Sequence, residues 1–320
     1  MKNEYSSGIL VYRYFSSEEK FLFLVTDSGR LDFPKGHIEK GESEISAAFR
    51  ETKEECNTVP NLVPFFKEKT SYFFYANGGK IHKYLTMFLG ESKNDTIKVS
   101  HEHKSYVWLS PKEALDKLNY KSAKELVTQA HEYLQRLKGM KRINSEYASL
   151  PSKSRTWDLS RTYVPGEGPL NAKAVLLGQA PGQKENIERR PFVGRSGMLL
   201  SKVLKNAKLK RDELYILSTV QFFPPKNRIP TDKEIELCKP FLIRQLELIK
   251  PKYVVLMGLV ATKTMLNMGA IAPNHSKLFG KDGRKYFVTF HPAAALRFHS
   301  IEVLMQHDFE NFNRLLSKKR

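Results

Sequence analysis

The chain has 320 residues, of which 41% are hydrophobic and 27% are charged, and this length and composition favour two globular domains over one. Its two cysteines provide no disulfide framework, which favours a reducing compartment over a secreted protein. No apolar run reaches about 18 residues and the opening MKNEYSSGIL lacks the pattern of a signal peptide, so we expect a soluble, cytoplasmic protein.

The net charge of +19 is distributed unevenly along the chain. Residues 1–140 carry 21 Lys and Arg against 19 Asp and Glu, a balance of +2, whereas residues 141–320 carry 32 against 15, a balance of +17. A basic balance of this size predicts a polyanionic partner for the second half, and we favour DNA, single- or double-stranded. The alternative is a surface charge that serves only solubility.

The first half opens with two strand patterns. Residues 8–12 and 21–25 are rich in aliphatic and aromatic side chains, and the Ser-Ser-Glu-Glu sequence at 16–19 predicts a hairpin turn between them. Further strands are predicted at residues 70–75, 82–89 and 106–109, and amphipathic helices at residues 111–118 and 122–137.

The segment at residues 33–58, FPKGHIEKGESEISAAFRETKEECNT, carries a cluster of carboxylates. If its second half is helical, Glu51, Glu54 and Glu55 share one face, because they stand at positions i, i+3 and i+4. Three like charges on one turn repel each other, and a hard cation such as Mg²⁺, which takes oxygen ligands, relieves that repulsion. Arg50 beside them can hold a carboxylate in one rotamer. The alternative is a solvated acidic helix face.

The spacing of this segment resembles the Nudix box. The matching positions are Gly36, Glu42, Arg50, Glu51, Glu54 and Glu55. The lead-in at residues 33–37 resembles the branch of asymmetric diadenosine tetraphosphate hydrolases, whereas Thr52, Asn57 and Thr58 depart from the usual residues. The resemblance implies that residues 1–140 form a Nudix hydrolase domain, an α/β/α sandwich with a mixed sheet.

The resemblance also implies the chemistry of this half. The substrate would be a nucleoside polyphosphate, either diadenosine tetraphosphate-like or a non-canonical nucleotide. Mg²⁺, or Mn²⁺ in its place, would bind Glu51, Glu54 and Glu55 and lower the pKa of a bound water. One glutamate, from the box or Glu102, would act as the general base.

Four further residues are expected to support this reaction. Lys35 and Arg50 would stabilise the charge that develops on the phosphate oxygens. Lys83 and Tyr84 would contact phosphate and adenine respectively, and the alternative for Tyr84 is a place in the hydrophobic core.

Residues 141–163 are basic and weakly periodic, and we predict that they form a linker and the opening arm of the second domain. In residues 164–320 strand and helix patterns alternate, which predicts a parallel sheet between helices. The predicted strands are residues 174–177, 214–217, 253–257 and 286–289, and the predicted helices are residues 196–205, 232–249 and 259–266. Ligands of such folds bind beyond the carboxyl ends of the strands, where Ser218 and His291 stand.

This half resembles the iron–sulfur, or family 4, uracil-DNA glycosylases. The matching segments run in the family's order at residues 164–168, 178–182, 190–195, 224–231 and 291–294. The resemblance implies an α/β/α domain with a parallel four-stranded sheet that excises uracil or another deaminated base from DNA. Such enzymes take the base out of the stack and read it in a pocket.

The resemblance implies roles for individual residues of this half. Phe192 would stack on the flipped base, His291 would stabilise the departing base or the charge around it, and Glu185 would lie near the attacking water. The loop at the first strand would contact the substrate through Gln179, Ala180, Pro181 and Gly182, with Gln179 standing where the family usually has Glu.

Two departures from the family pattern affect the chemistry. Of the four cluster cysteines only Cys238 is matched, and the other positions are Ser154, Trp157 and Phe222. One thiolate cannot hold a four-iron cluster, so we expect no iron–sulfur cofactor. Ser218 replaces the uracil-reading Asn, and one hydroxyl cannot supply both the donor and the acceptor of an amide. Two hypotheses follow: both domains catalyse, or the second is a non-catalytic DNA- or nucleotide-binding module and only the Nudix domain is an enzyme.

Overall fold

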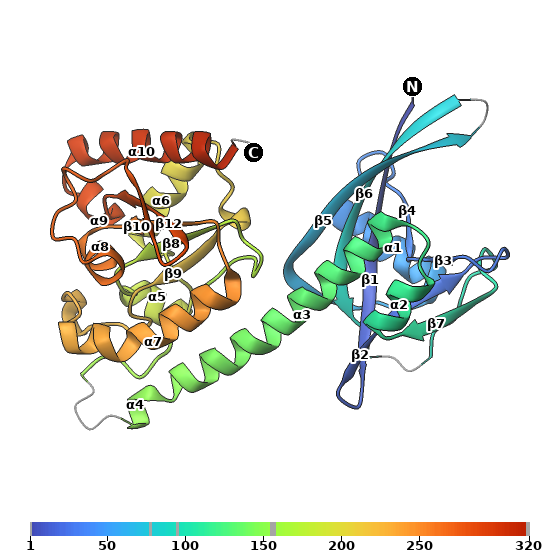
Figure 1. Ribbon diagram of the computed structural model, residues 1–320, viewed down its shortest axis with the longest axis horizontal. Helices are drawn as coiled ribbons and strands as arrows, with labels where there is room; N and C mark the ends of the chain where they lie inside the picture. Colours follow the sequence, from blue (N-terminus) through green and yellow to red (C-terminus); the bar gives the residue numbers. More distant parts are fainter. Residues whose placement is uncertain (1, 77–78, 94–95, 154–157, 318–320) are drawn as a thin grey trace. The chain divides into compact units, whose positions relative to one another are not determined.

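The computed structural model describes residues 2–76, 79–93, 96–153 and 158–317, and the chain divides into two compact units, Met1–Leu134 and Gln135–Arg320 (Figure 1). The division falls inside one helix, α3 (Lys121–Ala148). This helix extends well beyond the predicted residues 122–137, so residues 141–148 are helical where we expected a linker. None of the helices in the described ranges combines the length and apolar character needed to cross a bilayer.

The strands of the first unit are β1 (Lys2–Phe15), β2 (Glu18–Val25), β3 (Leu31–Asp32), β4 (Lys35–His37), β5 (Asn61–Ala76), β6 (Gly79–Glu91) and β7 (Ser105–Leu109). Within the described residues they form one seven-stranded sheet in the order β3-β2-β1-β6-β5, with β4 also paired to β1 and β7 to β2. Because β1 and β6 run parallel and the other pairs run antiparallel, the sheet is mixed, as predicted.

Helices cover both faces of this sheet. On one face α1 (Glu44–Cys56) packs Ala48 and Cys56 against Ile9 of β1. This helix begins where Ser43 accepts a hydrogen bond from the backbone N–H of Ser46, and it ends at a left-handed Asn57. The remaining helices are α2 (Pro111–Lys117) and the first half of α3, on which the ring of Tyr133 packs edge-on against Phe66 of β5.

The strands of the second unit are β8 (Ala174–Gly178), β9 (Tyr215–Ser218), β10 (Tyr253–Met257), β11 (Leu278–Lys281) and β12 (Arg284–Thr289). Their order is β11-β12-β10-β8-β9. The four strands other than β11 run parallel, which confirms the predicted parallel sheet, and β11 adds an antiparallel edge that we had not predicted. The sequence Leu-Phe-Gly-Lys of β11 is only partly apolar and largely exposed, so it lacks the signal of a buried strand.

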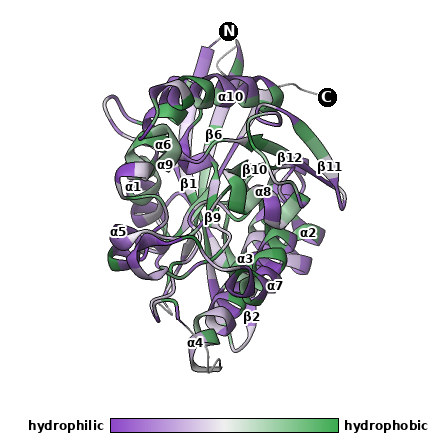
Figure 2. Cartoon of the chain, turned by 90° about the vertical axis from the view of Figure 1, so that its left-hand side faces the viewer, coloured by the Kyte–Doolittle hydropathy of each residue, from purple (hydrophilic) through white to green (hydrophobic). Residues whose placement is uncertain are grey.

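The helices of the second unit are α4 (Leu150–Lys153), α5 (Gln183–Glu188), α6 (Arg195–Asn206), α7 (Asp232–Ile249), α8 (Leu259–Leu266), α9 (Pro292–Ala295) and α10 (His299–Ser317), together with the second half of α3. Buried side chains of α6 and α10 pack against one face of the sheet, and α7 and α8 lie on the other face (Figure 1). Figure 2 shows that hydrophobic residues are concentrated on the central strands β10 and β12. The carboxyl ends of the parallel strands therefore open at one edge between two helical layers.

Candidate active sites

Arg50 organises the carboxylates of the first unit. Its Nε and Nη2 atoms donate to the two oxygens of Glu42 at 3.1 and 2.9 Å, and Nη1 donates to Glu51 at 2.8 Å and to Glu54 at 3.3 Å. The hydrogen bonds with Glu42 raise the pKa of Arg50 and lower that of Glu42. One guanidinium group therefore fixes three carboxylates of the box in position.

Glu55 is buried beneath this group. Its Oε2 accepts a hydrogen bond from the backbone N–H of Lys35 at 2.9 Å, while the Lys35 ammonium pairs with Asp32 at 2.7 Å. Burial, together with the charges of Glu51 and Asp32, raises the pKa of Glu55 to about 7. Any side chain larger than hydrogen at Gly36 would overlap the Glu51 carboxylate, which explains the glycine there.

These residues fit a hard divalent cation by their chemistry. They offer carboxylate oxygens, and burial, with a smaller effect of the Glu51 and Asp32 charges, raises the pKa of the Glu55 carboxyl, which a bound cation would lower again. In the described ranges no group of three or more His, Cys, Asp or Glu side chains is gathered closely enough to hold an ion, because Glu51 and Glu54 both turn toward Arg50. The donor set is present, and Arg50 competes with a cation for it.

Lys83 and Tyr84 lie on opposite faces of β6, because neighbouring residues of a strand alternate. Lys83 is on the face opposite α1, where burial and the charge of Lys35 lower its pKa. Tyr84 stacks on Tyr5 on the other face, with ring centroids 5.1 Å apart. That both residues contact one substrate stays a prediction. Tyr72 pairs with Lys83 across β5 and β6 and shares its face, as strand alternation predicts.

Glu102 lies in an exposed turn before β7. Within the residues that the structure describes, no hydrogen bond or ion pair joins it to Glu51, Glu54 or Glu55. Its charge instead acts on the neighbouring His103. The choice of general base between the box glutamates and Glu102 stays a prediction.

The predicted site residues of the second unit surround one cavity of about 310 Å³ at the carboxyl ends of the parallel strands. The predicted residues that line it are Gln179, Ala180, Pro181, Gly182, Glu185, Phe192, Ser218 and His291. The structure adds Lys184, Arg195, Asn227 and Arg228 to this lining. Asn227 and Arg228 belong to the matching segment at 224–231, so that segment could have predicted that they line the cavity.

His291 presents a hydrogen-bond donor to this cavity. Its Nδ1 accepts a hydrogen bond from the backbone N–H of Ala293 at 3.1 Å, so in the neutral ring the proton resides on Nε2. Burial lowers the pKa of His291 to about 4, which keeps the ring neutral near pH 7. Nε2 is buried and has no partner in the described part of the chain. A buried donor without a partner is costly, which is typical of a group reserved for a ligand.

The loop that carries Phe192 is fixed by Glu185. Its carboxylate accepts hydrogen bonds from three backbone N–H groups, those of Gly182, Val193 and Gly194, at 3.1, 2.9 and 2.7 Å. Glu185 thus ties the loop at 178–182 to the loop of Phe192, and its place near the attacking water stays a prediction. Phe192 itself has a φ of 52°, a conformation that costs energy for a non-glycine residue and is typical of functional sites.

The region of the expected cluster cysteines is filled by aromatic side chains. Tyr147 of α3 is fully buried and stacks on Phe241 with ring centroids 4.4 Å apart, and its ring meets Phe222 edge-on at 5.3 Å. Cys238 lies in the same hydrophobic cluster. Tyr147 therefore connects α3 to α7 and to the segment after β9.

These residues do not fit an iron–sulfur cluster, which needs four thiolates. The chain has one other cysteine, Cys56, and it is buried in the first unit. Burial raises the pKa of Cys238 to about 12, so the group is a thiol. Two of the expected positions, Ser154 and Trp157, lie outside the described residues.

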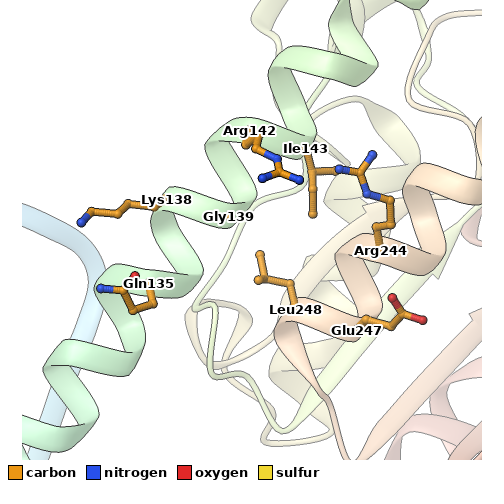
Figure 3. A pocket seen from close by; sticks show the side chains of 8 residues that line it. All are labelled: Gln135, Lys138, Gly139, Arg142, Ile143, Arg244, Glu247 and Leu248. Carbon is orange, nitrogen blue, oxygen red and sulfur yellow. The ribbon is translucent and has the colours of Figure 1, made fainter. Parts of the chain in front are cut away.

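A second hollow of about 520 Å³ lies between α3 and α7 (Figure 3). The two arginines that line it are paired with an acidic residue, because Arg142 and Arg244 both bind the carboxylate of Glu146, at 3.2 and 2.6 Å. Leu248 packs close to Gly139 on the facing helix. The hollow is a packing seam between two helices, and we assign it no chemistry.

Comparisons with known proteins match the two halves of the chain to two different families. Residues 5–130 match the family model of the NUDIX domain, and residues 165–317 match that of the uracil DNA glycosylase superfamily. A type-4 uracil-DNA glycosylase of Sulfurisphaera tokodaii is 34% identical over 188 residues, which cover 55% of this chain and 84% of that protein. An asymmetrical bis(5'-nucleosyl)-tetraphosphatase of Caenorhabditis elegans is 31% identical over 118 residues, which cover 36% of this chain and 85% of that protein.

Among solved structures, a C. elegans Ap4A hydrolase in a binary complex is 26% identical and matches with a TM-score of 0.37, covering 41% of this chain and 98% of that one. Each match covers more than two thirds of the relative's length. The tetraphosphatase matches the first half of this chain, and the glycosylase matches the second half. The chain therefore belongs to two families, the NUDIX family through residues 5–130 and the uracil DNA glycosylase superfamily through residues 165–317.

Proposed function

We propose that this chain is a bifunctional protein of nucleotide and DNA maintenance. The first unit hydrolyses a nucleoside polyphosphate, of the diadenosine tetraphosphate kind or non-canonical, and the second excises uracil or another deaminated base from DNA. The observation that carries the first activity is the group of box carboxylates around Arg50, supported by the similarity to an asymmetrical bis(5'-nucleosyl)-tetraphosphatase.

In the first unit Glu51, Glu54 and Glu55 would hold Mg²⁺ or Mn²⁺. Such an ion neutralises phosphate charge and lowers the pKa of water. Arg50 sets the rotamers of Glu51 and Glu54, and Lys83, on which the charges of Lys35 and Glu51 act, would supply a cation for a phosphate. A box glutamate accepts the proton of the attacking water. The oxygen of that water bonds to phosphorus as the bridging P–O bond breaks.

The test of this activity is hydrolysis of diadenosine tetraphosphate by the full chain with Mg²⁺. We expect Glu55→Gln to lower kcat by about a hundredfold or more, because an amide oxygen neither accepts the proton nor supplies the charge. The matched control is Glu125→Gln on α3, an exposed glutamate paired only with Lys121. Equal rates for Glu55→Gln and the control would overturn the proposal, as would inactivity toward every nucleoside polyphosphate tried.

In the second unit the unpartnered Nε2–H of His291 carries the proposal. When the bond between the sugar carbon and the base nitrogen breaks, the base takes the bonding electrons, and a neutral donor aimed at its carbonyl oxygen stabilises the negative charge that spreads there. The ring centroids of Phe192 and His291 lie 5.9 Å apart, and Phe192 supplies an aromatic surface for the flipped base. Water adds to the sugar carbon and its proton passes to the departing base or to solvent, while Glu185 acts by positioning the Phe192 loop.

A second candidate for this unit is a DNA- or nucleotide-binding module without excision, and Ser218 favours it. Its hydroxyl at the end of β9 can make fewer hydrogen bonds to a base edge than the amide of Asn. A pocket that leaves polar atoms of the base unpaired loses discrimination. Lys184 and Arg195 at the cavity would still supply cations for DNA phosphates.

Glycosylase activity on single- and double-stranded DNA that contains uracil distinguishes the two. If the unit is an enzyme, strand breaks appear after alkali, and His291→Ala lowers the rate by about a hundredfold, the usual effect of removing one such donor. The exposed His299→Ala is the matched control. No cleavage by the wild type, with cleavage gained by Ser218→Asn, would assign the unit to binding.

A further inference from the structure

An aromatic row crosses three strands on one face of the first sheet. Phe73 of β5 stacks on His82 of β6 with centroids 4.1 Å apart, His82 meets Tyr84 at 4.2 Å, and Tyr84 stacks on Tyr5 of β1 at 5.1 Å. The strand register places these residues side by side, because Phe73 pairs with His82 and Tyr5 with Tyr84. The hairpin of β5 and β6 and the start of β1, which carry the row, extend to one end of the unit (Figure 1).

The row is open to solvent. Tyr5 is 54% exposed, Phe73 51% and Tyr84 37%, and on the same face Tyr75 is 80% exposed. Large aromatic side chains in this number are unusual on a free surface, and a contiguous set of them marks a binding site. The row shares its face with α1, which packs against Ile9 and Phe88, whereas Lys83 and Tyr72 occupy the opposite side of the same strands.

The charges of this face favour a polyanion. By strand alternation it carries Lys67 and Lys69 of β5 and Lys80 of β6, and the Lys80 ammonium lies 4.4 Å from the centroid of the Phe73 ring. The carboxylate at its α1 end is Glu44, which Lys67 and Lys69 both bind at 2.6 Å. Three lysines against one carboxylate leave the face with a net positive charge, and this charge lies beside the aromatic row.

We infer that this aromatic row and its lysines bind single-stranded nucleic acid. Every base has a π-face, and bases of a single strand can extend a stack of protein rings at Tyr5 or lie against Tyr75, whereas a duplex keeps its base faces covered. The lysines beside the row supply partners for the phosphates that connect successive bases. A protein partner of this face would be expected to bring aliphatic side chains and carboxylates instead.

The experiment is ultraviolet cross-linking of the full chain to an oligothymidylate of about 15 nucleotides, a length within the range of such sites. This oligonucleotide contains no uracil, so excision does not alter it. We expect cross-linked peptides from β1, β5 and β6. Cross-links confined to residues 165–317 would overturn the inference and assign all nucleic-acid binding to the second unit.

Fluorescence anisotropy with the same oligonucleotide measures the contribution of the rings. The double variant Tyr5→Ala/Phe73→Ala should raise the Kd at least about fivefold, because each lost stacking contact weakens binding by that order. The conservative pair Tyr5→Phe/Phe73→Tyr should retain affinity. The matched control is Tyr120→Ala, an equally exposed tyrosine of the same unit.

Two results would contradict the inference. An unchanged Kd in the double alanine variant would show that the rings take no part in binding. A change in sedimentation of the double variant without a change in Kd would assign the face to contact between copies of the chain. Hydrolysis of diadenosine tetraphosphate depends on the carboxylates around Arg50, which none of these variants changes, so failure of the inference and failure of the proposed hydrolase are separable.

Discussion

Arg50 is the residue on which the geometry of the first site depends. Its guanidinium makes a two-point contact with Glu42 and one contact each with Glu51 and Glu54. A lysine keeps the charge but offers a single ammonium on a flexible stem, so it cannot reach all three carboxylates in a fixed geometry.

We therefore expect Arg50→Lys to lower kcat/KM for nucleoside polyphosphate hydrolysis by about 30-fold, the equivalent of about 2 kcal/mol for a lost charge-assisted contact. Steady-state kinetics at saturating Mg²⁺ measures this loss. Glu42→Gln, which weakens only the two-point contact, should give an intermediate rate. Wild-type kinetics in Arg50→Lys would mean that the carboxylates hold their positions without the guanidinium fork.

His291 makes a prediction about stability because its pKa is lowered from the ordinary value of about 6.5 to about 4 in the folded chain. Between these values the unfolded chain binds a proton that the folded chain excludes, so stability is full above about pH 6.5 and falls as the pH approaches 4. The contribution lost between about pH 7 and pH 5 is on the order of 2 kcal/mol.

Urea unfolding of wild type and His291→Asn at these two pH values isolates this contribution, because other titrating groups are common to both proteins. We expect the wild type to lose more stability than the variant on acidification. A parallel loss in the two proteins would mean that the imidazole titrates normally in the folded state.

At the scale of elements, α3 matters because it ends inside the core of the second unit. Tyr147 near its C-terminus is buried among Phe222, Phe241 and Cys238, where the related glycosylases were expected to hold a cluster. The aromatic cluster thus stands in place of a cofactor that the residues do not fit.

We expect Tyr147→Ala to lower the free energy of unfolding of the second unit by about 3–5 kcal/mol, the usual cost of removing a large buried aromatic side chain. Tyr147→Phe should cost much less, since it keeps the ring and loses only the contacts of the hydroxyl with the backbone N–H of Gln221 and with the Cys238 thiol. Thermal unfolding followed by near-ultraviolet circular dichroism measures both. If the alanine variant were as stable as the wild type, the Tyr147 side chain would contribute nothing to the stability of this core.

The sequence allowed most of these elements to be predicted, and the misses have physical reasons. The four parallel strands and α1 carry strong periodic signals, whereas the end of α3 is basic and was interpreted as a linker. Its buried residues Met140, Ile143 and Tyr147 stand three and four positions apart, a helical spacing that was present in the sequence. Strand alternation, which places Tyr84 and Lys83 on opposite faces of β6, was already present in the sequence.

Parts of the sites depend on contacts that no local pattern encodes. The motifs predicted which residues would surround the cavity of the second unit, but the missing partner of His291 Nε2 arises only when Gly178 and Phe192 pack beside the ring. In the same way, the Glu185 carboxylate accepts hydrogen bonds from three backbone N–H groups only because two loops, distant in sequence, meet in the folded chain.

At the scale of the molecule, the two sites lie in separate compact units, and energetic effects at well-separated sites are usually additive. We therefore expect Glu55→Gln to abolish nucleotide hydrolysis and leave action on uracil-containing DNA unchanged, and His291→Ala to do the reverse. Assaying both activities in both variants and in the double variant measures any coupling. A variant that loses both activities while remaining folded would show that one unit controls the other.

The uneven charge gives a further prediction for the whole molecule. With +17 in residues 141–320 and +2 in residues 1–140, binding of duplex DNA should release many counterions, whereas binding of a small nucleotide should release few. Raising the salt from about 50 to about 200 mM should weaken DNA binding by at least about tenfold. The KM for diadenosine tetraphosphate should change far less over the same range, because the phosphate site is small and partly buried and screening acts most strongly on exposed charges. An affinity for DNA that is indifferent to salt would mean that the basic surface of the second unit serves solubility, and the glycosylase proposal would then rest on the His291 cavity alone.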